Sequence, residues 1–420
     1  MNNDKNCSDY PIRHHDVVII GAGSGGVAMA ASLLKRQPDL DIALLDPSTT
    51  HDYQPGWTMV GGGVFSAKST RRRTESVIPD RCQWYRQAAE RVDAGEHTVT
   101  LADGCRLGYQ RLVVAPGLVL NWDAIEGLTD TLGENGVTSN YRYDLAPYTW
   151  SLVEQLKQGK ALFCQPQMPI KCAGAPQKAM YLSADHWRRN GCLKTIDVSF
   201  HNAGAVLFGV DAYVPELMKY VEMYGVELNF QERLIAVDGK AKVARFAKTV
   251  GEETETVERS FDMIHVVPPQ IAPEFIARSG LANPDGWLNL NPETLQHAQY
   301  PTIFGLGDAS GTANAKTMAA VRKQVPVVAE NLLASLRDQP LKAAYLGYGS
   351  CPLTVERGRI VLAEFGYEGA LQPTFPTWLN DGTKATRMAW WLKAKQLPWI
   401  YWNGMLKGHE WLAKPANRQV

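Results

Sequence analysis

Residues 16–26 read DVVIIGAGSGG, and the fold can be predicted from this segment outward. Its first five residues form a continuous apolar, largely β-branched run, which is typical of a parallel strand buried on both faces. Six residues in the pattern G-x-G-x-x-G follow at once, and residues 27–36 have the composition of a helix. A strand, a glycine turn and a helix in this order predict the start of a βαβ unit.

The glycines of this turn have separate tasks. Gly21 permits the tight bend, Gly23 lets the backbone approach a pyrophosphate, and Gly26 lets helix and strand pack closely. The helix N-terminus supplies N–H groups and a positive dipole for the phosphates. Asp46 follows the next predicted strand, 41–45, and lies 46 − 26 = 20 residues beyond the last glycine, where an acid suits ribose hydroxyls. The pattern therefore predicts a dinucleotide site; the alternative is a purely structural glycine turn.

Strands and helices continue to alternate along the chain, which predicts an α/β fold with two Rossmann-like domains. We expect the first domain at 1–150 and the second at 151–270. The chain then returns to the first domain at 271–340, and a distinct C-terminal region covers 341–420. The further elements expected are strands at 111–115, 161–164, 196–201, 263–267 and 302–304, and helices at 177–189, 213–224 and 317–336.

Composition narrows the class of protein. The 420 residues are 45% apolar and carry a formal net charge of +0, so no overall field attracts nucleic acid. The N-terminus is polar, without the apolar core of a secretory signal, and no run of 18 apolar residues could span a bilayer. Seven cysteines without a C-x-x-C pair predict neither a secreted disulfide framework nor a metal site. The run Arg71–Arg73 suggests a solvated loop.

The second α/β unit departs from the first at its strand-to-helix connection. Residues 165–176 read QPQMPIKCAGAP, with three prolines and one glycine, Gly174. Proline lacks the N–H group that a pyrophosphate needs. The next predicted strand runs into His201 and Asn202, where a nicotinamide dinucleotide would need an acid for its ribose. We therefore expect the domain to keep its shape without a nicotinamide site.

The same connection carries Cys172. Its neighbour Lys171 and the N-terminus of the following helix would both favour a thiolate. A second cysteine of interest, Cys351, lies among small residues in YGSCP, where a thiol can remain accessible. Local sequence leaves open whether either is reactive, and it gives no reason for the two to meet.

Several segments resemble known families. The segments RLVVAPG (111–117) and TIFGLGDAS (302–310) are similar to accessory motifs of flavoproteins with two dinucleotide-binding domains. The chain from residue 16 to about 411 looks like sulfide:quinone oxidoreductase, in the branch that includes the mitochondrial enzyme. The segments that carry this second resemblance are KCAGAPQKAMYLS (171–183), YGSCPLTV (348–355), DYQPGWTMVGG (52–62) and LPWIYWNGMLKG (397–408).

The resemblance implies FAD as the cofactor. Asp46 stands where many relatives have Glu, and Ala309 where some have Cys; both departures are compatible with the family. Ala89 stands where the backbone contacts adenine, and Asp308 where the ribityl–phosphate region is bound. The predicted FAD-binding residues are Gly21, Gly23, Ser24, Gly25, Gly26, Asp46, Gln54, Ala89, Gly117, Gly307, Asp308 and Lys316.

The resemblance also implies the chemistry. In that family, the cysteines that match Cys172 and Cys351 form a redox disulfide beside the flavin. Sulfide is expected to attack this disulfide, electrons to leave through FAD to a quinone, and a thiol or sulfite to accept the sulfane sulfur. Cys351 is the residue that the resemblance suggests as the persulfide carrier. The alternatives are a type II NADH:quinone oxidoreductase-like flavoenzyme and a non-catalytic flavin-binding sensor.

Residues 388–411, rich in Trp and Tyr, suggest an interfacial anchor. Lys393, Lys395 and Lys407 are expected to reach lipid phosphates. We therefore expect a monotopic protein on the cytoplasmic face of the inner membrane, with a quinone path from the bilayer. The alternative is that these aromatic residues form core or a dimer contact; the sequence leaves homo-oligomer formation open.

Overall fold

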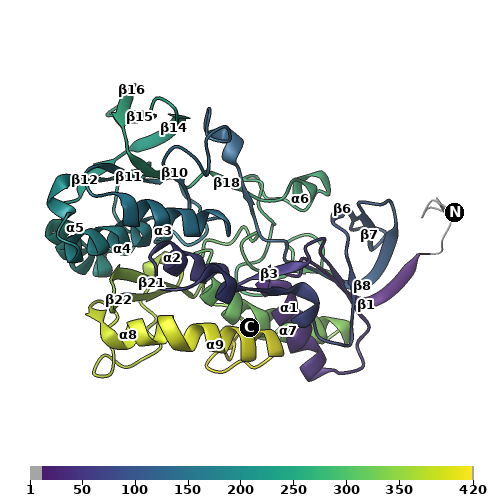
Figure 1. The fold of residues 1–420 in the computed structure, drawn as a ribbon. Coiled ribbons are helices and arrows are strands. Elements are labelled where there is room, and N and C mark those ends of the chain that lie inside the picture. Colours follow the sequence, from purple (N-terminus) through teal and green to yellow (C-terminus); the bar gives the residue numbers. More distant parts are fainter. Residues whose placement is uncertain (1–11, 419–420) are drawn as a thin grey trace.

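The computed structural model describes residues 12–418, so the polar start of the chain, with Cys7, lies outside it. Two lobes, each built on a sheet with helices against it, lie side by side (Figure 1). The C-terminal segment runs along the lower edge of both lobes in that view, where α8 and α9 are labelled. Both lobes contain parallel βαβ units, which confirms the predicted α/β fold.

The first sheet is built around β1 (Arg13–Ile20), whose last four residues are buried. β1 pairs in parallel with β2 (Ile42–Leu45) on one side and with β8 (Arg106–Val114) on the other. The strand order is β5-β2-β1-β8-β7-β6, and β19 also pairs with β8. The remaining strands are β5 (Cys82–Tyr85), β6 (Ala89–Asp93), β7 (Thr98–Leu101) and β19 (Ile303–Gly305).

Two long helices complete the first lobe. α1 (Ser24–Arg36) and α7 (Met318–Leu336) pack against each other and share one apolar core with β1 and β2. The chain therefore returns to this lobe through β19 and α7 after it has built the second lobe. Two short helices are α2 (Trp57–Gly61) and α6 (Glu274–Arg278).

The second sheet is parallel throughout, in the order β10-β17-β11-β12-β13. Its first strand, β10 (Val137–Thr138), precedes residue 151. The predicted boundary between the two domains at residue 151 stays a prediction. The other strands are β11 (Gly159–Gln165), β12 (Ile196–Asn202), β13 (Glu227–Phe230) and β17 (Met263–His265). The helices are α3 (Leu145–Gln155), α4 (Ala175–Arg189) and α5 (Val214–Tyr224).

Antiparallel elements surround these two sheets. One sheet is formed by β14 (Glu232–Asp238), β15 (Val243–Val250) and β16 (Glu253–Ser260), and another by β21 (Gly349–Glu356), β22 (Arg359–Phe365) and β23 (Ala385–Thr386). Three short pairs are β3 (Thr50–Asp52) with β4 (Arg71–Arg73), β9 (Val119–Leu120) with β18 (Gln270–Ile271), and β20 (Ala343–Ala344) with β24 (Ala416–Asn417).

The arginine run is not a free loop. It forms the strand β4, and Arg71 donates to both carboxylate oxygens of Asp52, at 2.7 and 2.8 Å. The guanidinium of Arg72 lies 4.2 Å from the centre of the Trp402 ring. The expectation of a loop was therefore wrong, and Arg71 is paired with an acid, whereas Arg72 and Arg73 are exposed as expected.

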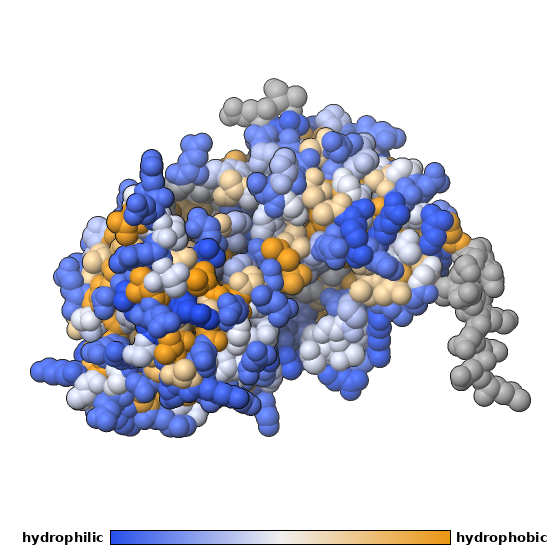
Figure 2. Space-filling model, turned by 90° about the horizontal axis from the view of Figure 1, so that it is seen from above, coloured by the Kyte–Doolittle hydropathy of each residue, from blue (hydrophilic) through white to orange (hydrophobic). Residues whose placement is uncertain are grey.

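The C-terminal helices α8 (Arg387–Trp391) and α9 (Leu397–Asn403) are joined by a π-helical segment. Tyr401 and Trp402 face inward and belong to the core of the first lobe, whereas Trp391 and Trp399 are more than half exposed. Within residues 12–418, every helix falls short of the length and hydrophobicity needed to cross a bilayer. The side of the molecule away from α8 and α9 is covered mainly by hydrophilic residues (Figure 2).

Candidate active site

The predicted dinucleotide turn lies between β1 and α1. Gly21 adopts φ +99°, a conformation that favours glycine. A Cβ atom at Gly26 would lie 1.7 Å from the carbonyl oxygen of Gly21, so helix and turn approach more closely than any side chain permits. A Cβ at Gly23 would meet no protein atom within 4 Å, which leaves its backbone open to a ligand. With α1 beginning at Ser24, free N–H groups at the helix start fit a pyrophosphate.

Asp46 is held beside this turn. Its carboxylate accepts hydrogen bonds from the backbone N–H of Ala22, at 2.7 Å, and of Ser48, at 2.8 Å. The indole of Trp84 donates to its carbonyl oxygen, at 2.9 Å. The acid at the end of β2 therefore adjoins the glycine turn, as ribose binding requires. Ala89 starts β6, shortly after the end of β5.

The accessory motifs supply two more glycines with positive φ. Gly117 follows β8 with φ +77°, and Gly307 follows β19 with φ +80°. Gly307 donates its N–H to Gln324 of α7, at 2.9 Å, which ties this turn to the helix. The Gly117 turn is next to β1, because β8 pairs with β1, and the Gly307 turn lies one strand further along, because β19 pairs with β8.

Lys316 is buried and Asp308 is half-buried, next to the Gly307 turn. The ammonium of Lys316 donates to the carbonyl oxygens of Asp308, at 2.8 Å, and Ser310, at 2.7 Å, and lies 3.8 Å from the centre of the Trp287 ring. Burial lowers the pKa of Lys316 to about 8. Burial raises the pKa of the Asp308 carboxyl, and the nearby ammonium groups of Lys171 and Lys316 oppose that rise.

The loop before α4 is joined to this region. Lys171 and Lys316 form a parallel backbone bridge, and Cys172 donates its N–H to the carbonyl oxygen of Lys316, at 2.8 Å. The ammonium of Lys171 donates to the side-chain carbonyl of Gln54. The structure thus brings Gln54, Asp308 and Lys316, all predicted from the sequence, together around the loop that carries the predicted redox cysteine.

The two predicted redox cysteines meet. The sulfur of Cys172 lies 3.7 Å from the sulfur of Cys351, although 351 − 172 = 179 residues separate them. Cys351 is on β21, 2% exposed, and β21 packs against α4. Cys172 has φ +51°, and a Cβ atom at Gly174 would lie 2.5 Å from the sulfur of Cys351. The short approach between loop and strand therefore depends on the single glycine of the connection.

A buried lysine polarises the pair. Lys178, in the first turns of α4 and 2% exposed, donates to the sulfur of Cys172, at 3.1 Å. The hydrogen bond from Cys351 and the charge of Lys178 lower the pKa of Cys172 well below its ordinary value, against the effect of burial. The pKa of Cys351 is raised by its hydrogen bond with Cys172 and by burial. The site therefore favours a thiolate on Cys172 and a thiol on Cys351.

Lys393 is buried, so the expectation that its side chain reaches lipid was wrong. Lys393, predicted to reach lipid, is 3% exposed, and its ammonium donates to the carbonyl oxygen of Pro55, at 2.9 Å. Burial and the charge of Lys178 together lower its pKa to about 7, against the opposing effect of the cysteine pair. Lys393 thus faces the cysteines from the C-terminal segment, while Lys395 and Lys407 are exposed as expected.

Sequence reasoning missed Lys178 and Lys393 as members of this site. Lys178 lies in the segment 175–185, in which every residue is buried. Apart from the acid at its end, the other residues of this segment are small, apolar or neutral. A lone charge in such a helix was the available signal. For Lys393 no equivalent signal exists, because lysines two residues apart on the same segment differ only in the face that they occupy.

The connection that holds Cys172 leaves little room for a second dinucleotide. It contains Pro166 and Pro169, and α4 has Pro176 in its first turn. His201, at the end of β12, is buried and bonded to Glu232, at 2.8 Å, so this edge is packed against β14. Among residues 12–418, no group of three or more His, Cys, Asp or Glu side chains is arranged to hold a metal ion.

Known proteins resemble the chain over almost its whole length. The family profile of pyridine nucleotide-disulphide oxidoreductases matches residues 15–153. The chain is 39% identical to the mitochondrial sulfide:quinone oxidoreductase of Dictyostelium discoideum, covering 95% of this chain and 87% of that protein. It is 35% identical to the mitochondrial sulfide:quinone oxidoreductase of Mus musculus, covering 94% and 87%. The crystal structure of sulfide:quinone oxidoreductase from Aquifex aeolicus shares the fold, with a TM-score of 0.76 at 20% identity, over 95% of this chain and 92% of that one.

Proposed function

The chain belongs to the sulfide:quinone oxidoreductase family, and from this premise we propose that Cys172 and Cys351 are its site of sulfide oxidation. Sulfide and a quinone are then its substrates, and FAD its cofactor. The observation that carries the proposal is the 3.7 Å distance between the sulfur of Cys351, on β21, and the sulfur of Cys172, on the loop that is hydrogen-bonded to Lys316.

The first lobe fits FAD through its own geometry. The turn 21–26 offers an open backbone and a helix start for the pyrophosphate, and Asp46 offers a carboxylate for the ribose. Gln54, Asp308 and Lys316 line the region next to the cysteine loop. When bound, FAD supplies a two-electron acceptor that a quinone can reoxidise. We assign to FAD binding Gly21, Gly23, Ser24, Gly25, Gly26, Asp46, Gln54, Ala89, Gly117, Gly307, Asp308 and Lys316.

The reaction starts from the Cys172–Cys351 disulfide. Hydrosulfide attacks one sulfur, the S–S bond breaks, and the other sulfur leaves with the electron pair as a thiolate. A thiol of lower pKa leaves faster, and Lys178 lowers the pKa of Cys172. Attack therefore falls on Cys351, which becomes the persulfide, while Cys172 becomes the thiolate held by Lys178.

An acceptor completes the sulfur transfer. A thiolate or sulfite attacks the outer sulfur of the Cys351 persulfide, and the S–S bond breaks to leave a Cys351 thiolate. Re-forming the Cys172–Cys351 disulfide then releases the two electrons that the quinone finally receives. Homo-oligomer formation, which the sequence left open, stays untested.

Replacing either cysteine tests the proposal. Cys172→Ser and Cys351→Ser should each abolish sulfide-dependent quinone reduction while the purified protein keeps its FAD absorbance. NADH added in place of sulfide should reduce no quinone in any variant, because the second lobe lacks the glycine turn. Activity with sulfide in either serine variant would overturn the cysteine assignment, and activity with NADH would favour the NADH:quinone oxidoreductase alternative.

We propose that the outward face of the C-terminal segment rests on a membrane, on its cytoplasmic side. Trp391, Trp399, Trp411 and Leu412 are 55%, 54%, 46% and 69% exposed, and the exposed Lys395 lies on the same segment. Exposed tryptophans with flanking lysines suit the boundary between lipid head groups and acyl chains. This surface would also bring a membrane quinone near the cofactor.

The inner face of that segment decides how the membrane proposal is tested. Deleting it would remove Tyr401, Trp402, Met405 and Leu406 from the core of the first lobe and would damage the cofactor site. Replacing the exposed Trp391 and Trp399 with serine leaves that core intact. The double variant should lose binding to phospholipid vesicles, and its rate of reduction should fall more for a long-chain quinone than for a short-chain one. Unchanged vesicle binding would refute the membrane proposal.

A further inference from the structure

The C-terminal helix α9 reaches the predicted FAD turn with one side chain. Tyr401 is 2% exposed, and its hydroxyl lies 2.7 Å from the hydroxyl of Ser24 and 2.6 Å from Nε2 of His51. Ser24 is the first residue of α1 and the fourth of the glycine turn. A residue 377 positions away in sequence therefore touches the segment that holds the pyrophosphate.

The direction of this hydrogen-bond chain follows from its far end. Nδ1 of His51 lies 3.0 Å from the carbonyl oxygen of Ala22, which can only accept, so Nδ1 carries the hydrogen. Burial lowers the pKa of His51, so the ring is neutral and its Nε2 accepts. Tyr401 then donates to His51, and Ser24 donates to Tyr401. Both ends of the chain thus fix residues of the turn, Ala22 and Ser24.

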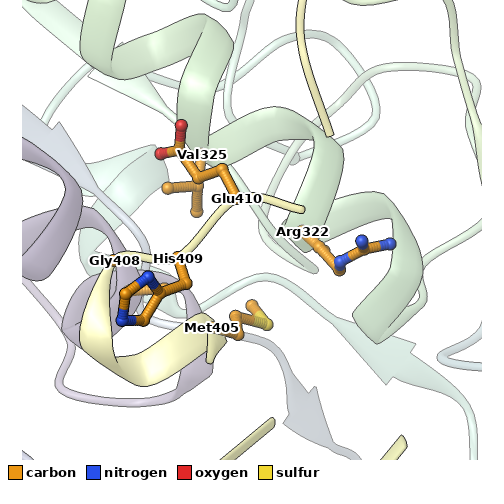
Figure 3. A pocket seen from close by; sticks show the side chains of 7 residues that line it. Arg322, Val325, Met405, Gly408, His409 and Glu410 are labelled. Carbon is orange, nitrogen blue, oxygen red and sulfur yellow. The ribbon is translucent and has the colours of Figure 1, made fainter. Parts of the chain in front are cut away.

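The position of Tyr401 is itself fixed by packing on both sides. Its ring centre lies 4.8 Å from that of Tyr53 and 4.8 Å from that of Trp402. Beyond α9, Glu410 accepts from Ser32, at 2.7 Å, and from both terminal nitrogens of Arg36, at 2.9 and 2.7 Å. Figure 3 shows the neighbouring contact, where residues 405–410 face α7 across a small pocket.

We propose that Tyr401 is a positioning residue for the cofactor turn, so that retention of FAD depends on the C-terminal segment. The hydroxyl holds the Ser24 side chain away from the open backbone and couples it, through His51, to Ala22. The inference rests on the assignment of this turn to FAD and is independent of the cysteine chemistry. It gives the C-terminal segment a second task beside contact with the membrane.

The test removes the hydroxyl and keeps the ring. Tyr401→Phe leaves a buried Nε2 of His51 without its donor and frees Ser24, so FAD should leave the holoenzyme about tenfold faster, as expected for one lost buried hydrogen-bond partner. Release is followed by the rise of FAD fluorescence after dilution into cofactor-free buffer. Trp402→Phe is the matched control, because it loosens the same packing and keeps the hydrogen-bond chain.

A double variant separates positioning from general stability. If Tyr401 acts through Ser24, FAD release from Ser24→Ala/Tyr401→Phe should equal that of the faster single variant. Additive effects, unchanged release in Tyr401→Phe, or equal acceleration in Trp402→Phe would each overturn the proposal. A failure of the proposed sulfide chemistry would leave these release rates unaffected, so the two outcomes are distinguishable.

Discussion

The same position in two βαβ units carries two different kinds of site. In the first lobe, β1 runs through a short glycine turn into α1, and the backbone itself is the proposed binding group. In the second lobe, β11 runs through residues 166–174 into α4, and a side chain, Cys172, takes that place. Both connections lie at the carboxyl ends of parallel strands and at a helix start, where negative charge is stabilised. One turn is suited to phosphates and the other to a thiolate.

A helix start needs different neighbouring residues for each purpose. Free N–H groups and closely packed glycines fit a ligand that bonds to the backbone. A proline-containing loop gives up N–H groups but presents Cys172 at φ +51°, fixed by its bond to Lys316. The charge that balances the thiolate comes from a lysine within α4 rather than from the backbone alone.

Glycine substitutions should separate the two turns most strongly. Gly26→Ala places a methyl group 1.7 Å from the Gly21 carbonyl oxygen, so FAD should be lost and stability should fall by about 3 kcal/mol. Gly174→Ala pushes on the sulfur of Cys351 and should keep FAD but slow sulfide oxidation up to about 100-fold. The measurements are the ratio of FAD to protein after purification, thermal unfolding and sulfide-dependent quinone reduction.

Gly23→Ala is the control for the first turn. Its added methyl group meets no protein atom within 4 Å, so stability should hold while FAD affinity falls. Full FAD retention in Gly26→Ala, or loss of FAD in Gly174→Ala, would contradict the assignment of FAD binding to the first turn and sulfide oxidation to the second.

Removing the charge beside Cys172 should have the next largest effect. Lys178→Met deletes a hydrogen bond between charged groups, worth about 1.5–3 kcal/mol, so the pKa of Cys172 should rise. The ultraviolet absorbance of the thiolate, titrated in a Cys351→Ser background, measures this pKa. Lys171→Met is the matched control and should shift it less, because that ammonium bonds to Gln54. Equal shifts would remove the special role of Lys178.

The smallest effect is expected at Lys393. Its pKa of about 7 means that the ammonium is present below neutral pH and lost above it. We compare the rate of sulfide oxidation by the unaltered protein with the rate of Lys393→Met at each pH. The ratio of the first rate to the second should fall by less than about tenfold as pH rises through 7. Taking the ratio cancels the ionisation of sulfide itself. A ratio independent of pH would show that this lysine does not act on the cysteines.

The first turn could be predicted from sequence because its physics is local. Gly21, Gly26 and Asp46 lie within one βαβ unit. Their spacing already predicts the close packing of helix and turn, and the position of the acid beside the turn, that the structure shows. The partnership of Cys172 and Cys351 could not be derived in that way, since it depends on how β21 packs against α4. The resemblance to a family supplied what local reasoning lacked.

The C-terminal segment shows the same limit at the scale of one helix. Lys393 and Lys395 both lie on the π-helical segment, yet the first is buried and the second is exposed, so they occupy different faces. Composition marked the segment as amphipathic, but only the docked structure decides that Lys393 and Tyr401 face inward. The expectation of lipid contact was therefore wrong for one lysine of the three.

Anaerobic addition of sulfide to the FAD-loaded protein shows whether the cysteine pair is the route by which electrons reach the flavin. We expect bleaching of the flavin absorbance in the unaltered protein, recovery when a quinone is added, and no bleaching in Cys172→Ser or Cys351→Ser at equal FAD content. Flavin reduction by sulfide in either variant would contradict this route.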